Sequence, residues 1–270
     1  MIDLHIHTTS SDGTRTPKNT IIEAYEKKIQ AISITDHDTT EGFSEAVTFA
    51  EEFNIELIPG VEISAFYGTQ EIHILGYYID VKNKPLQAEL EVIKQSRSNR
   101  AIQMVTLLNK YNYDISIQEV MEEAKTGTIG RPHIARCLVQ KGYYRSTDEV
   151  FHNLLSRGKK AYVERYKLSI QDAIELISSA GGISVVAHPG LYKSPLDWTQ
   201  LIKYGISGVE AFHSKHDRAT SKKYKDIATK HGLIVTSGSD CHGNGEASIL
   251  GTTEGEYSII ENMKALLPTV

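Results

Sequence analysis

The sequence predicts an α/β protein built on a mainly parallel β-sheet. Short runs of β-branched residues alternate with segments of helical periodicity over most of the 270 residues. Glycines stand where helices should end, at Gly181, Gly182 and Gly232, each close before the next β-branched run. The length allows one α/β barrel or two ordinary domains, and either can bury a sizeable core.

Seven segments have the composition expected of strands, and five segments between them have the period of helices. The predicted strands are residues 2–7, 31–35, 55–62, 71–79, 182–187, 208–212 and 233–237. The predicted helices are residues 16–28, 40–53, 170–180, 196–204 and 219–231. Thr39 or Thr40 is expected to cap the second helix.

Residues 85–166 interrupt this alternation, because they show helical patterning and no convincing strand. Apolar residues such as Leu86, Leu90 and Ile93 recur at helical spacing, and the segment is rich in Lys and Arg. A helical subdomain inserted into a barrel explains both facts. We therefore expect a barrel domain of residues 1–84 and 167–270, with residues 85–166 as an inserted helical subdomain.

Composition excludes several classes of protein. The formal net charge of −5 argues against a protein that binds duplex DNA by bulk charge. No stretch approaches the roughly 20 consecutive apolar residues of a membrane span. Two cysteines, Cys137 and Cys241, are too few for a disulfide-stapled secreted module. We expect a cytoplasmic globular protein with no membrane association and no obligate protein partner.

Two histidines lie two residues apart on the first predicted strand. His5 and His7 face the same side of a strand, while Leu4 and Ile6 face the other side. Paired imidazoles at the carboxyl end of a strand are typical of a metal site, because a divalent ion needs several convergent donors. Two core histidines that bond to their neighbours are the alternative at this point.

A third histidine and two carboxylates follow the next two strands. His37 and Asp38 come directly after the apolar residues 31–34, at a position where barrel enzymes carry catalytic groups. Asp38 could instead cap the next helix, which would leave His37 unexplained. Glu62 ends the third strand, where a carboxylate can bridge two metal ions. An exposed glutamate at a strand end is the alternative for Glu62.

Four further candidate ligands belong to later strands. His73 lies within a strand, and taken alone it is more often structural than a ligand. His188 follows an apolar strand directly and precedes Pro189, which fixes the turn. Asp240 and His242 are two residues apart on a loop flanked by glycines, which lets backbone and side chains approach a ligand closely.

The joint placement of these residues decides between the alternatives. Five strand ends present His, Asp or Glu, and a sixth strand contributes His73. Structural histidines would scatter over helices and surfaces, whereas clustering at one edge of a sheet is what a multinuclear metal site requires. Mixed imidazole and carboxylate donors suit zinc, manganese or iron. The sequence therefore predicts a metallohydrolase.

Six motifs in this order resemble the PHP (polymerase and histidinol phosphatase) family. They are DLHIHTTSSDG at 3–13, TDHD at 35–38, PGVEIS at 59–64, HILGY at 73–77, AHPG at 187–190 and SGSDCHG at 237–243. The resemblance implies a distorted (β/α)7 barrel, which agrees with the seven predicted strands. GRPHIA at 130–135 resembles the small insertion of the nucleoside bisphosphate phosphatase and RNase AM branch.

The resemblance also implies a site for three divalent metal ions, which we expect to be Mn, Zn or Fe, with Mg as a further candidate. The first ion would take His5, His7, Glu62 and Asp240; the second would share Glu62 and add His73 and His188; the third would take Asp12, His37 and His242. Histidinol phosphatases commonly have His where this chain has Asp12, which weakens the prediction of a histidinol-phosphate phosphatase.

The implied chemistry is phosphate ester hydrolysis by a hydroxide that bridges two metal ions. Glu62, His188 and Asp240 would be catalytic as ligands, and His213 or His188 would be the general acid. In the resembled branch the positions matching Arg131, His133 and His213 bind substrate phosphate. A nucleoside 3′,5′-bisphosphate, cleaved to the 5′-monophosphate and phosphate, or the 5′ end of a short RNA would fit such a site.

Other functions remain open at this point. A histidinol-phosphate phosphatase or another small phosphomonoesterase would use the same ligands. An amidohydrolase also begins with HxH in a barrel, but it would be expected to have a bridging lysine where we place Glu62. A non-catalytic metal-binding PHP module would be expected to lack one or two ligands. Three histidines, His152, His216 and His231, are predicted to be ordinary surface residues.

Overall fold

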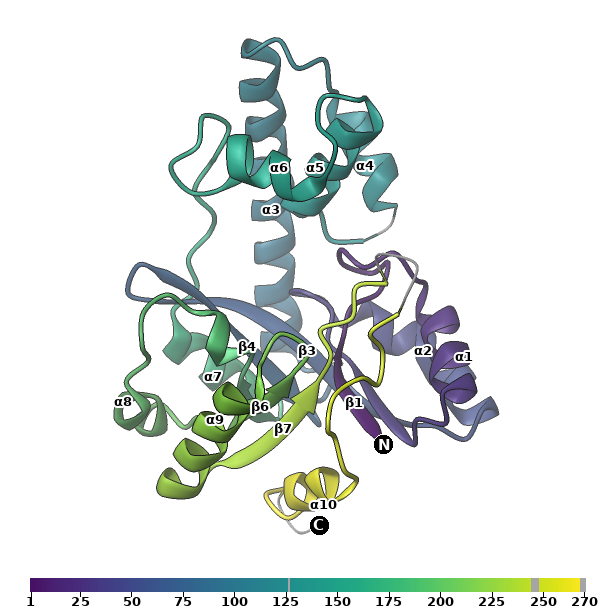
Figure 1. The fold of residues 1–270 in the computed structure, drawn as a ribbon, viewed down its shortest axis with the longest axis vertical. Coiled ribbons are helices and arrows are strands. Elements are labelled where there is room, and N and C mark those ends of the chain that lie inside the picture. The colour runs from purple at the N-terminus through teal and green to yellow at the C-terminus, as the bar shows by residue number, and fades with distance from the viewer. Residues whose placement is uncertain (126, 244–247, 268–270) are drawn as a thin grey trace.

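A computed structural model describes residues 1–125, 127–243 and 248–267, which form a nearly closed barrel beneath a helical cap (Figure 1). Seven strands make one sheet, and they follow one another around the barrel in chain order. The strands are β1 (Ile2–Ile6), β2 (Ala31–Ile34), β3 (Glu56–Tyr67), β4 (Gln70–Tyr77), β5 (Ile183–Val186), β6 (Gly208–His213) and β7 (Ile234–Gly238). This architecture confirms the predicted α/β class and the barrel.

The barrel is closed by the segment that follows β7. The backbone N–H of Asp240 donates to the carbonyl oxygen of His5 at 2.8 Å, and the N–H of His7 donates to Cys241 at 2.9 Å. These bonds pair the loop after β7 with β1 in the parallel direction. The closure therefore places Asp240 and His242 beside His5 and His7, although more than 200 residues separate them in the chain.

One strand runs against the others, which the predicted, mainly parallel sheet did not specify. β4 is antiparallel to both β3 and β5. β3 continues past Glu62 to Tyr67, and the chain turns through Gly68, whose φ is +62°, a conformation that glycine adopts without strain. Because β4 runs backwards, its amino-terminal half lies at the same rim as the carboxyl ends of the parallel strands. His73 thereby reaches that rim.

Helices surround the barrel wall at or near the predicted positions. They are α1 (Pro17–Glu26), α2 (Glu41–Glu52), α7 (Ile170–Ser179), α8 (Trp198–Lys203) and α9 (Arg218–His231). The helix α10 (Ser258–Lys264) was not predicted, and it lies at the end of the barrel away from the cap (Figure 1). Its Ile259, Ile260 and Met263 pack against Ile2 and Ile183, so this end is sealed by apolar contacts.

The cap consists of α3 (Lys84–Lys110), α4 (Ile117–Ala124), α5 (Arg131–Gln140), α6 (Thr147–Val150) and a π-helical turn at Phe151–Leu155. The described residues between 85 and 166 contain no strand, as predicted. The division into domains at 84/85 and 166/167 stays a prediction. None of the helices in the described ranges has both the length and the apolar character to cross a membrane.

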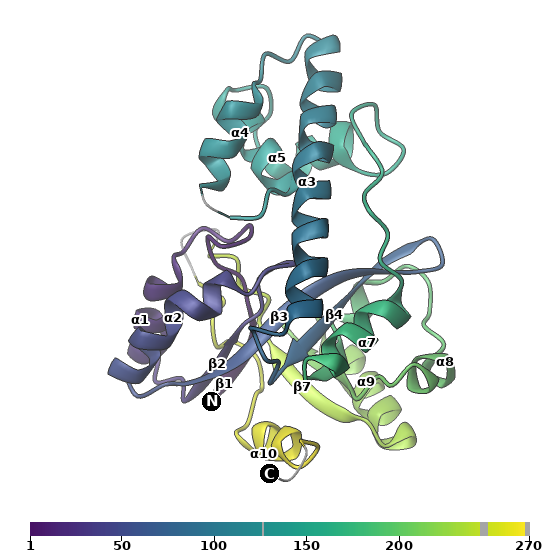
Figure 2. The same cartoon turned by 180° about the vertical axis from the view of Figure 1, so that it is seen from behind.

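The helix α3 belongs to two apolar cores. Leu86 and Leu90 in its first half pack with α7 in the barrel core, whereas Met104 and Leu108 in its second half pack with α4 and α5. Figure 2 shows α3 rising from the barrel wall into the cap as one continuous rod. A single 27-residue helix shared by both cores holds the cap above the rim.

Candidate active site

His5 on β1 and His7 directly after it point into the barrel as predicted. His5 and His7 are completely buried or nearly so, and their Nε2 atoms lie 3.2 Å apart. Leu4 and Ile6 face the opposite side and join the apolar cores of the barrel wall. The alternation of β1 therefore places two imidazoles at the rim and two aliphatic side chains behind them.

Glu62 lies at the centre of the site and is buried. Imidazole nitrogens approach its two carboxylate oxygens from several strands: His73 Nδ1 at 2.8 Å, His37 Nδ1 at 2.8 Å, His188 Nε2 at 3.1 Å, His7 Nε2 at 3.2 Å and His5 Nε2 at 3.4 Å. Burial alone would raise the pKa of Glu62, but the surrounding histidines lower that pKa well below its ordinary value. Glu62 is therefore an ionised carboxylate.

Asp240 lies on the opposite side of the same cluster of histidines. Its Oδ1 lies 3.2 Å from His7 Nε2 and 3.5 Å from His5 Nε2, and its Oδ2 lies 3.4 Å from His213 Nε2. Its φ of +58° is a strained conformation for a residue other than glycine, which turns the side chain back over β1. Despite burial, which raises the pKa, the nearby His5 and His213 lower the pKa of Asp240 well below its ordinary value.

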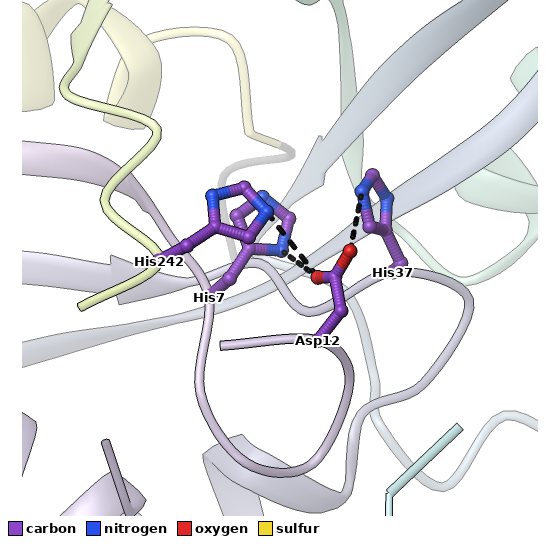
Figure 3. Close-up of side chains that lie close together, drawn as sticks. All are labelled: His7, Asp12, His37 and His242. Atoms are coloured by element: carbon purple, nitrogen blue, oxygen red, sulfur yellow. Dashed lines mark ion pairs between the residues drawn. The ribbon is translucent and has the colours of Figure 1, made fainter. Parts of the chain in front are cut away.

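A third group forms around Asp12 (Figure 3). His242 Nε2 lies 3.2 Å from Asp12 Oδ1, His7 Nδ1 lies 3.9 Å from the same oxygen, and His37 Nε2 lies 4.0 Å from Oδ2. Burial alone would lower the pKa of His242, but the Asp12 carboxylate raises it to about 10. Figure 3 shows His7 and His242 on one side of Asp12 and His37 on the other.

The donor geometry fits several divalent cations that share ligands. Four sets of ligand atoms each lie within 4.8 Å of one another: His7, Asp12, His37 and His242; His5, Glu62 and His188; His5, His7 and Asp240; and His37, Glu62 and His73. Glu62 Oε2 and His37 Nδ1 are 2.8 Å apart but make no hydrogen bond within the described residues. Buried polar atoms left without a hydrogen bond are expected where ligands face bound cations, and this pair lies where Glu62 of the first two predicted sets meets His37 of the third.

Glu210 is a buried carboxylate that the sequence analysis missed. Its Oε1 lies 3.0 Å from His5 Nδ1, and its Oε2 accepts the backbone N–H of His188 at 2.7 Å. The carboxylate therefore orients His5 from behind and holds the turn of His188, whose φ is +29°. A β-bulge at Ala211 lets Glu210 and His213, three residues apart on β6, both face the interior.

Replacing Glu210 by Gln should lower metal affinity and kcat/KM by about 10- to 100-fold, because partners that orient ligating histidines have effects of this size. Metal content after dialysis and phosphate release are the measurements. Glu52→Gln is the matched control, because Glu52 is exposed at the end of α2. Unchanged metal affinity in Glu210→Gln would contradict the positioning role.

Asp38 does not cap the helix α2. Its Oδ1 accepts the backbone N–H of Ser64 at 2.8 Å, and its Oδ2 accepts Nε of Arg97 at 2.9 Å and lies 3.4 Å from Arg165. Although burial raises its pKa, Arg97 and Arg165 lower the pKa of Asp38. The capping alternative is therefore wrong, and Asp38 instead ties the rim next to His37 to α3 of the cap.

Glu71 continues this ionic network toward the predicted substrate residues. It pairs with Arg165, its Oε2 lies 3.9 Å from Arg131, and its Oε1 lies 3.6 Å from His73 Nε2. Arg131 is the first residue of α5. Through Glu71 it is connected to His73, which is a candidate metal ligand. His133, two residues further along α5, is buried, and its Nδ1 accepts the backbone N–H of Gly130 at 2.9 Å.

His133 is electrically neutral in this environment, since burial and the nearby Arg136 lower its pKa to about 4. Arg136 also reaches the rim, where its guanidinium donates to the backbone carbonyl of Asp12 at 3.2 Å. The sequence analysis did not single out Arg136. Nothing in its local sequence distinguishes it, because the contact depends on how the cap lies over the barrel.

A cleft of about 510 Å³ separates the cap from the rim. The candidate ligands Asp12, Asp240 and His242 form its floor, and Pro132 and Phe151 of the cap face them. The cations Arg136 and Lys215 and the apolar Ile249 complete its sides. The cleft is therefore a mixed apolar and cationic space directly above the candidate metal ligands.

His216 is the one histidine whose prediction as an ordinary surface residue is wrong. It is half-buried; its Nδ1 donates to the Ala211 carbonyl at 3.0 Å, and its Nε2 accepts the N–H of Gly190 at 3.1 Å. The ring thus holds the turn that follows His188. His152 is exposed, and His231 lies in the last turn of α9.

The barrel and its rim of imidazoles and carboxylates define a metal-dependent hydrolase. The sequence profile of the PHP domain matches residues 3–226. The chain belongs to the PHP domain family.

Proteins that are similar to this chain agree with this assignment. A 3′,5′-nucleoside bisphosphate phosphatase of Chromobacterium violaceum is 35% identical over 251 residues, which cover 91% of this chain and 88% of the relative. The 5′-3′ exoribonuclease Rnm of Escherichia coli is 34% identical over 251 residues, which cover 89% and 84%. The crystal structure of a protein from Bifidobacterium adolescentis, assigned as a metal-dependent phosphoesterase, has a TM-score of 0.92 at 30% identity and covers 100% of this chain and 97% of its own.

These findings confirm the predicted family, fold class and enzyme class. The chain is a metal-dependent phosphoesterase, which is a hydrolase of phosphoric esters. The assignment of each predicted ligand to a particular ion, and the roles of the predicted catalytic and substrate residues, stay predictions.

Proposed function

We propose that the enzyme removes the 3′-phosphate of nucleoside 3′,5′-bisphosphates and also acts on the 5′ ends of short RNA, using three divalent cations. The observation that carries this proposal is the cleft, in which candidate ligands face a cap that bears Arg131 and Arg136. A substrate with two phosphates matches a site with two regions that attract phosphate, which are the cations held by the candidate ligands and the arginines of the cap. The names of the two relatives describe substrates of this kind.

The ligands fall into three sets in this proposal. His5, His7, Glu62 and Asp240 would hold the first ion, Glu62, His73 and His188 the second, and Asp12, His37 and His242 the third. Among the described residues, the clusters of close donor atoms contain the third set complete and the first set without Glu62, whereas Glu62 meets His73 and His188 in two separate clusters. Bound Mn, Zn or Fe ions would activate water at neutral pH and offset charge on the phosphoryl oxygens. The free, buried Cys137 and Cys241 accord with the cytoplasmic location that we expect.

Of the two candidates for general acid, His213 is the one free to act on the departing oxygen. Its Nδ1 accepts the backbone N–H of Lys215 at 3.1 Å, so the neutral ring carries its proton on Nε2 and would stabilise that oxygen by a hydrogen bond; full proton transfer would need the imidazolium, in which the Lys215 hydrogen bond is broken. That Nε2 faces the site, 3.4 Å from Asp240 Oδ2, and makes no hydrogen bond within the described residues. His188 is less suitable, because its Nε2 lies 3.1 Å from Glu62 as a candidate ligand.

Arg131 would hold the phosphate that is not cleaved. Its guanidinium lies over Phe151 at 5.7 Å and 3.9 Å from Glu71, so it is only weakly engaged by the protein. A planar guanidinium offers a phosphate two parallel hydrogen bonds. Phe151 and Pro132 line the cleft beside it and supply an apolar surface for a nucleobase.

The test is a comparison of substrates with and without the second phosphate. Arg131→Met should raise KM for adenosine 3′,5′-bisphosphate by about 10- to 100-fold, as expected for loss of a charged hydrogen bond. The same variant should leave KM for adenosine 3′-monophosphate nearly unchanged. Equal losses on both substrates, or faster release of phosphate from histidinol phosphate than from the bisphosphate, would contradict the proposed function.

A further inference from the structure

A second cavity, of about 650 Å³, lies outside the cleft. One wall is the helix α9, and the other is the segment 252–254 that precedes α10. Phe212 and Ser214 lie at the base, where β6 ends. No candidate metal ligand lines this cavity, so it is not part of the proposed metal site.

The loop between β6 and α9 borders both the cavity and the cleft. His213, Ser214 and His216 line the cavity, whereas Lys215 between them lines the cleft. His213 also faces Asp240 at 3.4 Å. A flexible ligand that leaves the cleft beside Lys215 therefore enters the cavity directly.

Three cations of α9 face this cavity. Arg218, Lys222 and Lys225 stand at positions i, i+4 and i+7, which share one face of a helix, and all three are exposed. They extend over roughly 10 Å along the helix axis, since each residue rises about 1.5 Å. A row of this length can follow several phosphates of a chain rather than bind only one.

The remaining lining adds features that suit single-stranded nucleic acid. Phe212 is half-buried, and the Lys225 ammonium lies 5.3 Å from its ring centre, so an aromatic face stands beside a cation. Thr252 and Thr253 place hydroxyl groups on the opposite wall. Cationic grooves with aromatic side chains are the usual means of binding single strands without sequence preference.

We propose that this cavity binds the 3′ continuation of a single-stranded RNA whose 5′ end occupies the cleft. The proposal rests on the proposed function, and it makes the exonuclease substrate, rather than the mononucleotide, the ligand of α9. A nucleoside bisphosphate ends within the cleft and never reaches the cavity. The two substrates are therefore expected to respond differently to changes on α9.

Two carboxylates lie near these cations. Removing a carboxylate should affect RNA binding in the opposite direction to removing a cation, which provides a second test. Asp226 pairs with Lys222 at 2.7 Å, with both side chains largely exposed, and Glu254 lies on the far wall. Exposed pairs of this kind are weak and can open when a phosphate competes for the lysine. Removing the Asp226 charge should therefore strengthen RNA binding.

The experiment compares adenosine 3′,5′-bisphosphate with a 5′-phosphorylated single-stranded RNA of about six nucleotides, a length within the site sizes of single-strand grooves. Arg218→Ala with Lys225→Ala should lower kcat/KM for the RNA by about tenfold and its salt slope by roughly 1.4, at about 0.7 per phosphate contact. The bisphosphate should be cleaved at the unaltered rate. Asp226→Asn should raise kcat/KM for the RNA alone.

Lys223→Ala is the matched control, because Lys223 is exposed on the same helix but does not line the cavity. The proposal is overturned if the double variant cleaves RNA like the wild type, if both substrates lose activity equally, or if Lys223→Ala has the same effect. Should the wild type cleave no bisphosphate, the proposed function fails. Anisotropy of the labelled RNA on the metal-free variants would then still decide whether the cavity binds RNA.

Discussion

Glu62→Gln should lower kcat/KM by roughly 1,000-fold or more and reduce the number of bound metal ions. The side chain keeps its size but loses the charge on which five imidazoles converge at 2.8 to 3.4 Å. Loss of several kcal/mol of charge stabilisation corresponds to a rate change of this order. Metal counting by mass spectrometry and phosphate release from the same sample are the measurements.

Glu56→Gln is a suitable control for Glu62→Gln. Glu56 lies on the same strand, at the end away from the rim, where it pairs with Lys264 and accepts a hydrogen bond from Tyr257. It should change neither metal content nor kcat. If Glu62→Gln retained full metal content and activity, the central position of Glu62 in the site would be refuted.

Asp38→Asn should reduce the free energy of unfolding by about 3 to 5 kcal/mol, the usual cost of removing one partner of a buried ion pair. Asp38 is 1% exposed, and it is the carboxylate that pairs with both Arg97 and Arg165. The substitution leaves two largely buried guanidinium groups without this counter-charge. Urea unfolding at neutral pH measures the loss.

The exposed pair of Lys222 and Asp226 provides the comparison for Asp38→Asn. Their side chains are 75% and 64% exposed, so Asp226→Asn should change the free energy of unfolding by at most about 1 kcal/mol. Similar values for the two variants would show that the Asp38 network contributes no more than a surface ion pair. The Asp38 network would then contribute little to the link between cap and rim.

The rim could be predicted from the sequence because its residues follow a local rule. His5 and His7 alternate with Leu4 and Ile6 on one strand, and the period of two decides which side chains face inward. Glu62, His188 and Asp240 each end an apolar run or follow it closely. Carboxyl ends of parallel strands meet at one edge, so local patterns were enough to bring distant residues together.

The parts that could not be predicted depend on contacts between distant segments. In the sequence, Glu210 is one polar residue within a predicted strand. Only the bulge at Ala211 turns both Glu210 and His213 inward. Asp38 fits a helix cap by sequence, and its partner Arg97 is 59 residues away on α3. His216 acquires its role from the turn at Gly190, on another strand's exit. Propensity and spacing carry no information about such partners.

The most direct test of the central claim is phosphate release from adenosine 3′,5′-bisphosphate by protein stripped of metal and then reloaded with manganese. Bound metal and released phosphate are counted in the same sample. The stripped protein should be inactive, and activity should rise with bound metal until about three ions are held per chain. A fully loaded sample that releases no phosphate from any nucleoside bisphosphate or short RNA would contradict the account.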